Sequence, residues 1–148
     1  MANAKPSQSC KKVETWLRRQ GFRSKAAKKN AATKDATDFD RRVVTYNVNS
    51  STRTRLCTLL HEAGHVLIYR SRQRRPQNLV HGRRLADMSV VSKKATKQQK
   101  LQIMDEEIAA WERGWKLGRR LKLRVARNVF DTHQTRSLMT YVRWIIRQ

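Results

Sequence analysis

The chain has 148 residues, 39% of them hydrophobic, and its 34 Lys and Arg against 11 Asp and Glu give a formal net charge of +23. A chain of this length buries one modest hydrophobic core and is short for two domains. No stretch approaches the ~20 apolar residues of a membrane span, and the N-terminus has no apolar segment of signal-peptide length. We therefore expect a reduced, soluble, cytoplasmic protein with no membrane partner.

The positive charge is distributed along the whole chain, so it is not a detachable basic tail. A field of this size attracts polyanions and makes nucleic acid a candidate partner. No helix-turn-helix, zinc-finger or single-strand-binding signature accompanies the charge. The two cysteines, Cys10 and Cys57, have neither the spacing of a metal site nor that of a disulfide framework, and we expect free thiols.

The first 40 residues predict a basic N-terminal helix and a linker. Four residues indicate the helix by their spacing and by a glycine where it would end: Val13, Trp16, Leu17 and Gly21. We expect residues 1–9 to be frayed, and residues 24–40, which lack an apolar stripe, to form a linker or a weak helix. Residues 41–148 are predicted to form the main domain.

Residues 42–48 are the best predicted strand, because Val44, Tyr46 and Val48 alternate with residues of the opposite face. The polar segment 49–52 offers an N-cap for a following apolar helix, which we expect to end before Pro76. The sequence therefore predicts a strand, a short loop and a long helix in succession.

Residues 77–96 have weak patterning, with 79–81 and 88–91 compatible with short strands or irregular segments. From Thr96 a helical period returns, and its apolar stripe consists of Leu101, Met104, Ile108, Trp111 and Trp115. A last helix is expected to begin near Asp131 and Thr132, with four residues facing the core: Leu138, Tyr141, Val142 and Ile145. The predicted class is α+β, mostly helical with a short sheet.

The long apolar helix contains the sequence His-Glu-Ala-Gly-His at positions 61–65. At i and i+4, His61 and His65 share one helical face and can offer two nitrogens to one metal ion, while Glu62 can reach a metal-bound water. This His-Glu-x-x-His pattern predicts a zinc site with Glu62 as catalytic base. Chance recurrence of two histidines in a buried helix is the alternative interpretation.

A catalytic zinc site needs a third protein ligand. The extended class His-Glu-x-x-His-x-x-Gly-x-x-His is excluded, because Ile68 and Ser71 occupy its glycine and histidine positions. At ~100° per residue, Glu107 lies at the inner edge of the apolar stripe, whereas Glu106 points away from it. Two glycines on the side of Glu107 would let another helix approach closely: Gly114 and Gly118. In order of preference, the candidate ligands are Glu107, Glu106 and His81.

The strand, the His-Glu-Ala-Gly-His helix and the sequence Glu-Ile-Ala-Ala-Trp, which begins at Glu107, resemble the gluzincin metallopeptidases. They are similar in particular to the small ImmA/IrrE-like and minigluzincin-type members, including those of phages and mobile elements. The resemblance covers residues 42–118. It implies a zincin-like fold, Zn²⁺ held by His61, His65 and Glu107, Glu62 as base, and the host cytoplasm as location if the gene belongs to a phage.

These features predict a zinc-dependent metallopeptidase that hydrolyses a protein or peptide substrate. If the positive charge of the chain serves to bind nucleic acid, the substrate would be a protein associated with nucleic acid. The strand 42–48 could hold an extended substrate at a free edge, and an ordinary core strand is the alternative interpretation. Tyr46 and Tyr69 are candidate oxyanion donors, although the pattern assigns neither. The alternatives are a non-catalytic nucleic-acid-binding protein on a zincin-like scaffold and a phage accessory protein that neutralises packaged nucleic acid. Dependence of function on Glu62 separates the peptidase from both.

Overall fold

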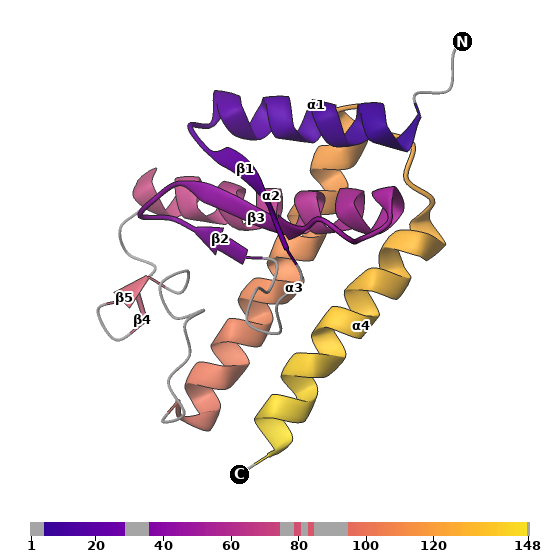
Figure 1. The fold of residues 1–148 in the computed structure, drawn as a ribbon. Helices are drawn as coiled ribbons and strands as arrows, with labels where there is room; N and C mark the ends of the chain where they lie inside the picture. The colour runs from indigo at the N-terminus through magenta and orange to yellow at the C-terminus, as the bar shows by residue number, and fades with distance from the viewer. Residues whose placement is uncertain (1–4, 29–35, 75–78, 81–82, 85–94, 148) are drawn as a thin grey trace.

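A computed structural model of the chain describes residues 5–28, 36–74, 79–80, 83–84 and 95–147 (Figure 1). Its elements, in chain order, are α1 (Pro6–Arg19), β1 (Arg23–Ala27), β2 (Ala36–Asp38), β3 (Val43–Asn47), α2 (Thr52–Arg74), β4 (Leu79–Val80), β5 (Arg83–Arg84), α3 (Lys97–Arg120) and α4 (Arg127–Ile146). The described part of the chain is thus mostly helical with a small sheet, as the predicted α+β class requires.

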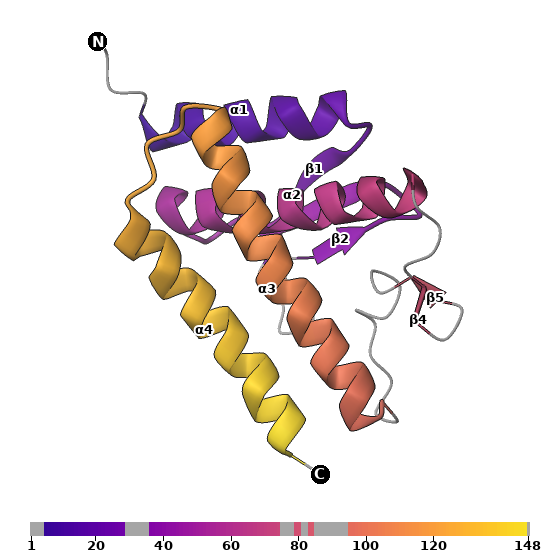
Figure 2. The ribbon, with the colours of Figure 1, turned by 180° about the vertical axis from the view of Figure 1, so that it is seen from behind.

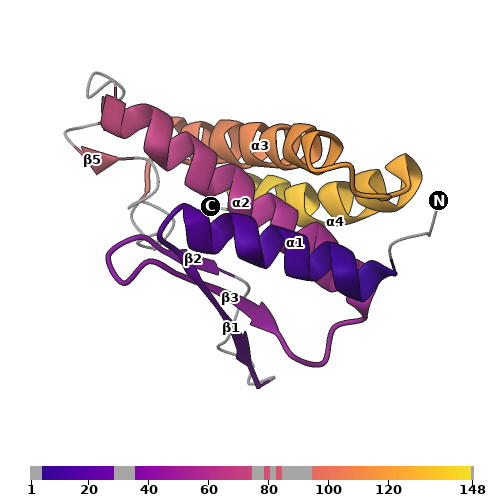
Figure 3. The same ribbon diagram turned by 90° about the horizontal axis from the view of Figure 1, so that it is seen from above.

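Helix α2 is the central element of the fold. It contacts α1 on one side, β2 and β3 on a second and α3 on a third. Seen from above, the sheet and the α3–α4 hairpin lie on opposite sides of α2 (Figure 3). The hairpin itself is antiparallel, as the view from behind shows (Figure 2). The predicted order of strand, short loop and helix is confirmed: Ser51 caps α2 by accepting a hydrogen bond from the Thr54 amide at 3.2 Å.

The three-stranded sheet has the order β1-β3-β2, with β1 parallel and β2 antiparallel to β3. The prediction of a linker or weak helix over 24–40 is therefore wrong at β1 and β2. Both strands are polar and short, so pairing with β3, rather than their own apolar residues, specifies them. Because β3 is central, β1 pairs with residues 43–47 on one edge and β2 with residues 43–45 on the other, so pairing of a substrate along the whole of this strand is not possible. Among the described strands, β1 and β2 provide the outer edges of this sheet.

The hydrophobic core contains residues from both predicted regions, 1–40 and 41–148. Val13 and Leu17 of α1 are fully buried, as are Val44 of β3 and Leu59 and Leu60 of α2. Helix α1 begins at Pro6 and buries Ser9 and Cys10, so residues 6–9 are helical rather than frayed. Gly21, with φ +86°, ends α1 as predicted. Both cysteines are buried free thiols.

The buried face of α3 differs from the predicted apolar stripe. Leu101 and Ile108 are 56% and 40% exposed, whereas the buried residues are Ile103, Glu106, Glu107, Ala110, Trp111, Gly114, Leu117 and Gly118. Close contact with α2 explains this phase. A β-carbon on Gly64 would lie 2.6 Å from the carbonyl carbon of Ala110, and one on Gly114 would lie 2.8 Å from that of Leu60. Small residues, rather than large apolar ones, therefore set the face that α3 presents.

The last helix begins at Arg127, four residues before the predicted cap at 131–132. Phe130 is buried there and its ring lies 5.2 Å from that of Trp111, so packing on α3 holds the first turn of α4. The four residues predicted to face the core are partly buried. Residues 88–91 lie outside the described part of the chain, and β4 pairs with β5 in an antiparallel ladder. None of the described helices has the length and apolar character of a membrane span.

Candidate metal centre

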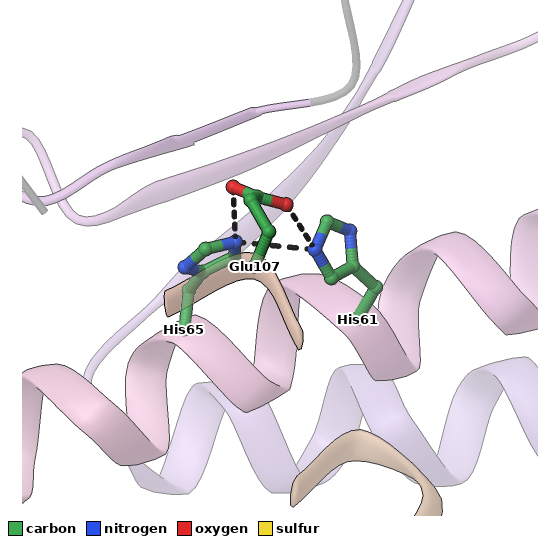
Figure 4. Close-up of side chains that lie close together, drawn as sticks. All are labelled: His61, His65 and Glu107. Carbon is green, nitrogen blue, oxygen red and sulfur yellow. Dashed lines mark hydrogen bonds and ion pairs between the residues drawn. The ribbon is translucent and has the colours of Figure 1, made fainter. Parts of the chain in front are cut away.

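Three side chains from two helices converge where α2 and α3 cross (Figure 4). His61 and His65 lie one turn apart on α2, and their Nε2 atoms are 3.2 Å from each other. Glu107 on α3 places Oε2 2.8 Å from Nε2 of His61 and Oε1 3.1 Å from Nε2 of His65. The close approach of α3 at Gly64 brings the carboxylate to the histidines, since Ala110 follows Glu107 by one turn.

The cluster buries several ionisable groups together. Glu62, Glu106 and Glu107 are 4–6% exposed, and two imidazoles are buried beside them. Among the residues whose side chains the structure describes, no lysine or arginine is buried. Desolvated charge is stable only when it is compensated, and a divalent cation between the two imidazoles and Glu107 would provide such compensation.

The donor atoms fit Zn²⁺. Two imidazole nitrogens and one carboxylate form one of the ligand sets of catalytic zinc, and tetrahedral bonds of 2.0–2.1 Å place ligand atoms roughly 3.3 Å apart. The ligand atoms of His61, His65 and Glu107 lie within 4.8 Å of one another, and the closest pairs are separated by 2.8–3.2 Å. A modest separation of these atoms would fit zinc without a change of backbone.

In the metal-free protein, protons compensate part of the charge. Burial lowers the pKa of His65, but hydrogen bonds to Glu106 and Glu107 outweigh it and raise this pKa to about 10. Burial alone would raise the pKa of Glu107, but the hydrogen bonds with His61 and His65 hold it well below the usual range. A metal ion competes for the same atoms, because it binds imidazole in the neutral form.

Glu106 is the second partner of His65. Its Oε1 lies 3.4 Å from Nδ1, the ring nitrogen opposite the Glu107 side. The expectation that Glu106 points away from the interior is wrong: it is 6% exposed, because the close approach at the glycines turns that face of α3 inward. A carboxylate on the outer nitrogen of a histidine fixes the tautomer that presents Nε2 to a metal. Glu106 thus lies at the outer nitrogen of His65, whereas Glu107 is the carboxylate that reaches the Nε2 atoms of both histidines.

Glu62 has two partners. Its Oε1 lies 3.5 Å from Nδ1 of His61, and its Oε2 accepts a hydrogen bond of 2.6 Å from the hydroxyl of Thr37. Thr37 lies on β2, where it pairs with Val44 of β3. Sequence reasoning missed Thr37, since a lone threonine in a polar segment carries no signal until β2 is known to pair beside α2. The edge strand of the sheet thus reaches the candidate base.

Two aromatic residues complete the surroundings. Tyr141 of α4 is half-buried, and burial together with the charge and hydrogen bond of Glu107 raises its pKa. Trp111 stacks on the His61 ring, with centroids 4.3 Å apart and planes 7° from parallel. Tyr69 instead stacks on Phe39, 4.7 Å away.

Sequence reasoning placed Tyr141 in the core without a role. Antiparallel packing of α4 on α3, a tertiary feature, brings its hydroxyl to the site. Tyr46 lies under the guanidinium of Arg55, 5.1 Å from its carbon, rather than at the metal centre. His81, the third candidate ligand, lies outside the described residues.

Comparison of the chain with protein families, with curated proteins and with solved structures finds no match.

Proposed function

We propose that the protein is a zinc-dependent metallopeptidase of the gluzincin type. His61, His65 and Glu107 hold the metal ion, and Glu62 is the general base. One observation carries the proposal: two imidazoles and a carboxylate converge within bonding range of one ion in a buried cluster, with a further carboxylate on the residue that follows His61.

Zinc in this position supplies Lewis acidity, which makes water nucleophilic near neutral pH and polarises a carbonyl group. The Glu62 carboxylate accepts the proton that the attacking water loses and later gives it to the amine nitrogen of the departing product. Thr37 fixes this carboxylate through its hydrogen bond to Oε2. Glu106 holds His65 from behind, so that the two helices keep the ligands in place.

Tyr141 is the candidate donor for the oxygen that becomes negative during attack. Its hydroxyl donates a hydrogen bond to Glu107, and burial with the nearby carboxylates raises its pKa further above the usual value, so the phenol is protonated at neutral pH. A donor held in place before the reaction stabilises developing charge without reorganisation.

The substrate, a protein or peptide segment, is expected to lie along the outer edge of β2. That strand carries Thr37 beside Glu62, and β3 covers its other edge. Main-chain hydrogen bonds to an edge strand hold an extended peptide with little dependence on its sequence.

The test compares cleavage of a set of quenched fluorogenic peptides by the zinc-loaded wild type and by two variants. Glu62→Gln removes the base, and Glu112→Gln is the matched control, because Glu112 is exposed and pairs with Lys116 at 2.7 Å. We expect Glu62→Gln to retain zinc and to lose roughly 10²–10⁴-fold in kcat, while Glu112→Gln cleaves like the wild type. Equal cleavage by Glu62→Gln, or a zinc-loaded wild type that cleaves none of the peptides, would contradict the proposal.

A further inference from the structure

A group of cationic side chains surrounds the turn between α3 and α4 and takes no part in the metal centre. This surface, here called the basic junction, has five exposed members: Arg119, Arg120, Lys122, Arg124 and Arg127. No acidic residue occurs in the sequence between Glu112 and Asp131. Arg120 follows Glu107 by 13 residues on one helix, which places the junction about 20 Å from the metal ligands. The junction lies at the end of the hairpin opposite the chain terminus C (Figure 2).

The turn that carries these side chains has a fixed backbone. The amide of Lys122 donates to the carbonyl of Arg119 at 3.0 Å, and that of Leu123 donates to the carbonyl of Gly118 at 2.9 Å. This pair of bonds is a Schellman motif, which closes the C-terminus of a helix. Leu123 is buried and anchors the turn to the core. The cations are therefore presented by a rigid element, so less conformational entropy is lost when they bind a partner.

Lys122 has φ +54°, in the left-handed region. Glycine adopts this conformation without strain and is the usual residue at this position of the motif, whereas a β-carbon is disfavoured there. The chain thus has a long cationic side chain where the turn itself favours glycine. The backbone conformation does not explain why a lysine occupies this position. We therefore attribute the residue to the positive charge of its side chain.

Ordinary roles of surface cations explain part of the junction. Arg119 and Arg120 occupy the last turn of α3, where positive charge stabilises the helix dipole. Arg127 pairs with Asp131 at 2.9 Å and lies 4.6 Å over the ring of Trp115. Lys122 lies beyond the helix and makes no ion pair with a described residue. The junction therefore carries more positive charge than the helix ends require.

The surroundings of the junction indicate the kind of partner. The large hydrophobic residues that are exposed in the described ranges are Val48, Leu101, Ile108, Met139 and Ile146, and each lies outside the segment 113–130. A membrane-binding surface would combine its cations with such residues. Arg127 lies over the ring of the nearby Trp115, so that face of the indole is not open for stacking on unpaired bases.

We propose that the basic junction binds the phosphate backbone of a double-stranded nucleic acid without reading its bases. The net charge of +23 steers the chain to a polyanion, and the junction supplies a rigid set of contacts. DNA and RNA duplexes share this chemistry. The proposal does not depend on metal binding or on peptidase activity, so its failure leaves the proposed function untouched.

The experiment measures anisotropy of a labelled DNA duplex, and of an RNA duplex of the same sequence, over a series of salt concentrations. The junction variant replaces Arg119, Arg120 and Lys122 with glutamine. The control variant makes the same change in net charge at the opposite end of the hairpin, where Lys97, Arg143 and Arg147 are exposed. Counterion release predicts that the junction variant binds roughly 10²-fold more weakly at 0.1 M salt and has a salt slope smaller by about 2.7.

The control is expected to change affinity and slope by much less. Equal losses in the two variants would show that the overall charge, rather than the junction, binds the duplex. Binding of the wild type to phosphatidylserine vesicles but to neither duplex would overturn the proposal in favour of a membrane surface. Lys122→Gly provides a check against misfolding: we expect a higher Tm and weaker duplex binding, and unchanged binding would contradict the role of Lys122. A difference between the two duplexes identifies the preferred nucleic acid.

Discussion

Replacing Gly64 with alanine should separate the two helices that form the metal centre. The new β-carbon would lie 2.6 Å from the carbonyl carbon of Ala110, which is 0.8 Å inside the 3.4 Å at which ordinary contact begins. The atoms it meets belong to the backbone of α3, so a side-chain rotation cannot relieve the overlap. Overpacking costs about 3 kcal/mol, and the better helix propensity of alanine offsets about 1 kcal/mol. The expected net loss of stability is thus about 2 kcal/mol.

The same displacement moves Glu107 away from the histidines, because Ala110 and Glu107 lie one turn apart on α3. Ligand distances at a metal site tolerate errors of only about 0.2 Å, so zinc affinity should fall roughly 10–100-fold. Urea denaturation and a competitive zinc titration measure the two effects. Gly118→Ala is the matched control: its β-carbon would lie 3.3 and 3.6 Å from the Leu60 methyl groups, which can move.

The control should keep wild-type zinc affinity and gain up to about 1 kcal/mol from its helix propensity. If Gly64→Ala had the same unfolding free energy and the same zinc affinity as Gly118→Ala, then α2 and α3 would not approach each other as described. The positioning of Glu107 by helix contact would then be wrong, whatever the identity of the metal.

Three other predictions concern the centre. In the metal-free protein, the raised pKa of His65 contributes unfolding free energy that is fully present below pH 6.5 and is lost as the pH rises toward 10. The lowered pKa of Glu107 contributes unfolding free energy that is fully present above pH 4.5 and is lost in acid. Urea denaturation over a pH series should therefore find the greatest unfolding free energy between pH 4.5 and 6.5; a steady rise up to pH 10 would contradict the pairing. Tyr141→Phe should lower kcat roughly 10²–10³-fold at unchanged zinc affinity, and an unchanged kcat in the peptide assay would remove Tyr141 from the mechanism. Glu106→Gln should weaken zinc binding roughly 10–100-fold, whereas Asp105→Asn, at an exposed neighbour, should not; equal zinc affinity in the two variants would show that Glu106 does not orient His65.

Much of the α2 side of the centre could be predicted from the sequence. The pair His61 and His65 needs only helical geometry, and the strand before α2 and the cap at Ser51 have local signals. Glu107 could be preferred over Glu106 because it shares a side of the helix with Gly114 and Gly118, and Gly114 is a point of close approach to α2. The expected stripe was right at Trp111, which is buried, and wrong at Leu101 and Ile108, which are exposed. Backbone contact at Gly64 and Gly114 helps to set the phase of α3.

The rest of the centre depends on tertiary structure. Strand β2 has three residues, of which only Thr37 favours a strand, and its pairing with β3, which brings Thr37 to Glu62, cannot be read from them. Tyr141 reaches Glu107 only because α4 packs antiparallel to α3. The burial of Glu106 follows from the same helix contact that turned the predicted stripe outward. In each case a neighbour distant in sequence decides the role of the residue.

The central claim is that the cluster at His61, His65 and Glu107 binds a metal ion, and metal analysis of the purified protein tests it most directly. The protein is stripped with a chelator, equilibrated with zinc, freed of excess metal and examined by elemental analysis and circular dichroism. We predict one tightly bound zinc per chain in the wild type and its loss in His61→Ala, whose fold should persist. A well-folded wild type that retains no zinc after this treatment would contradict it.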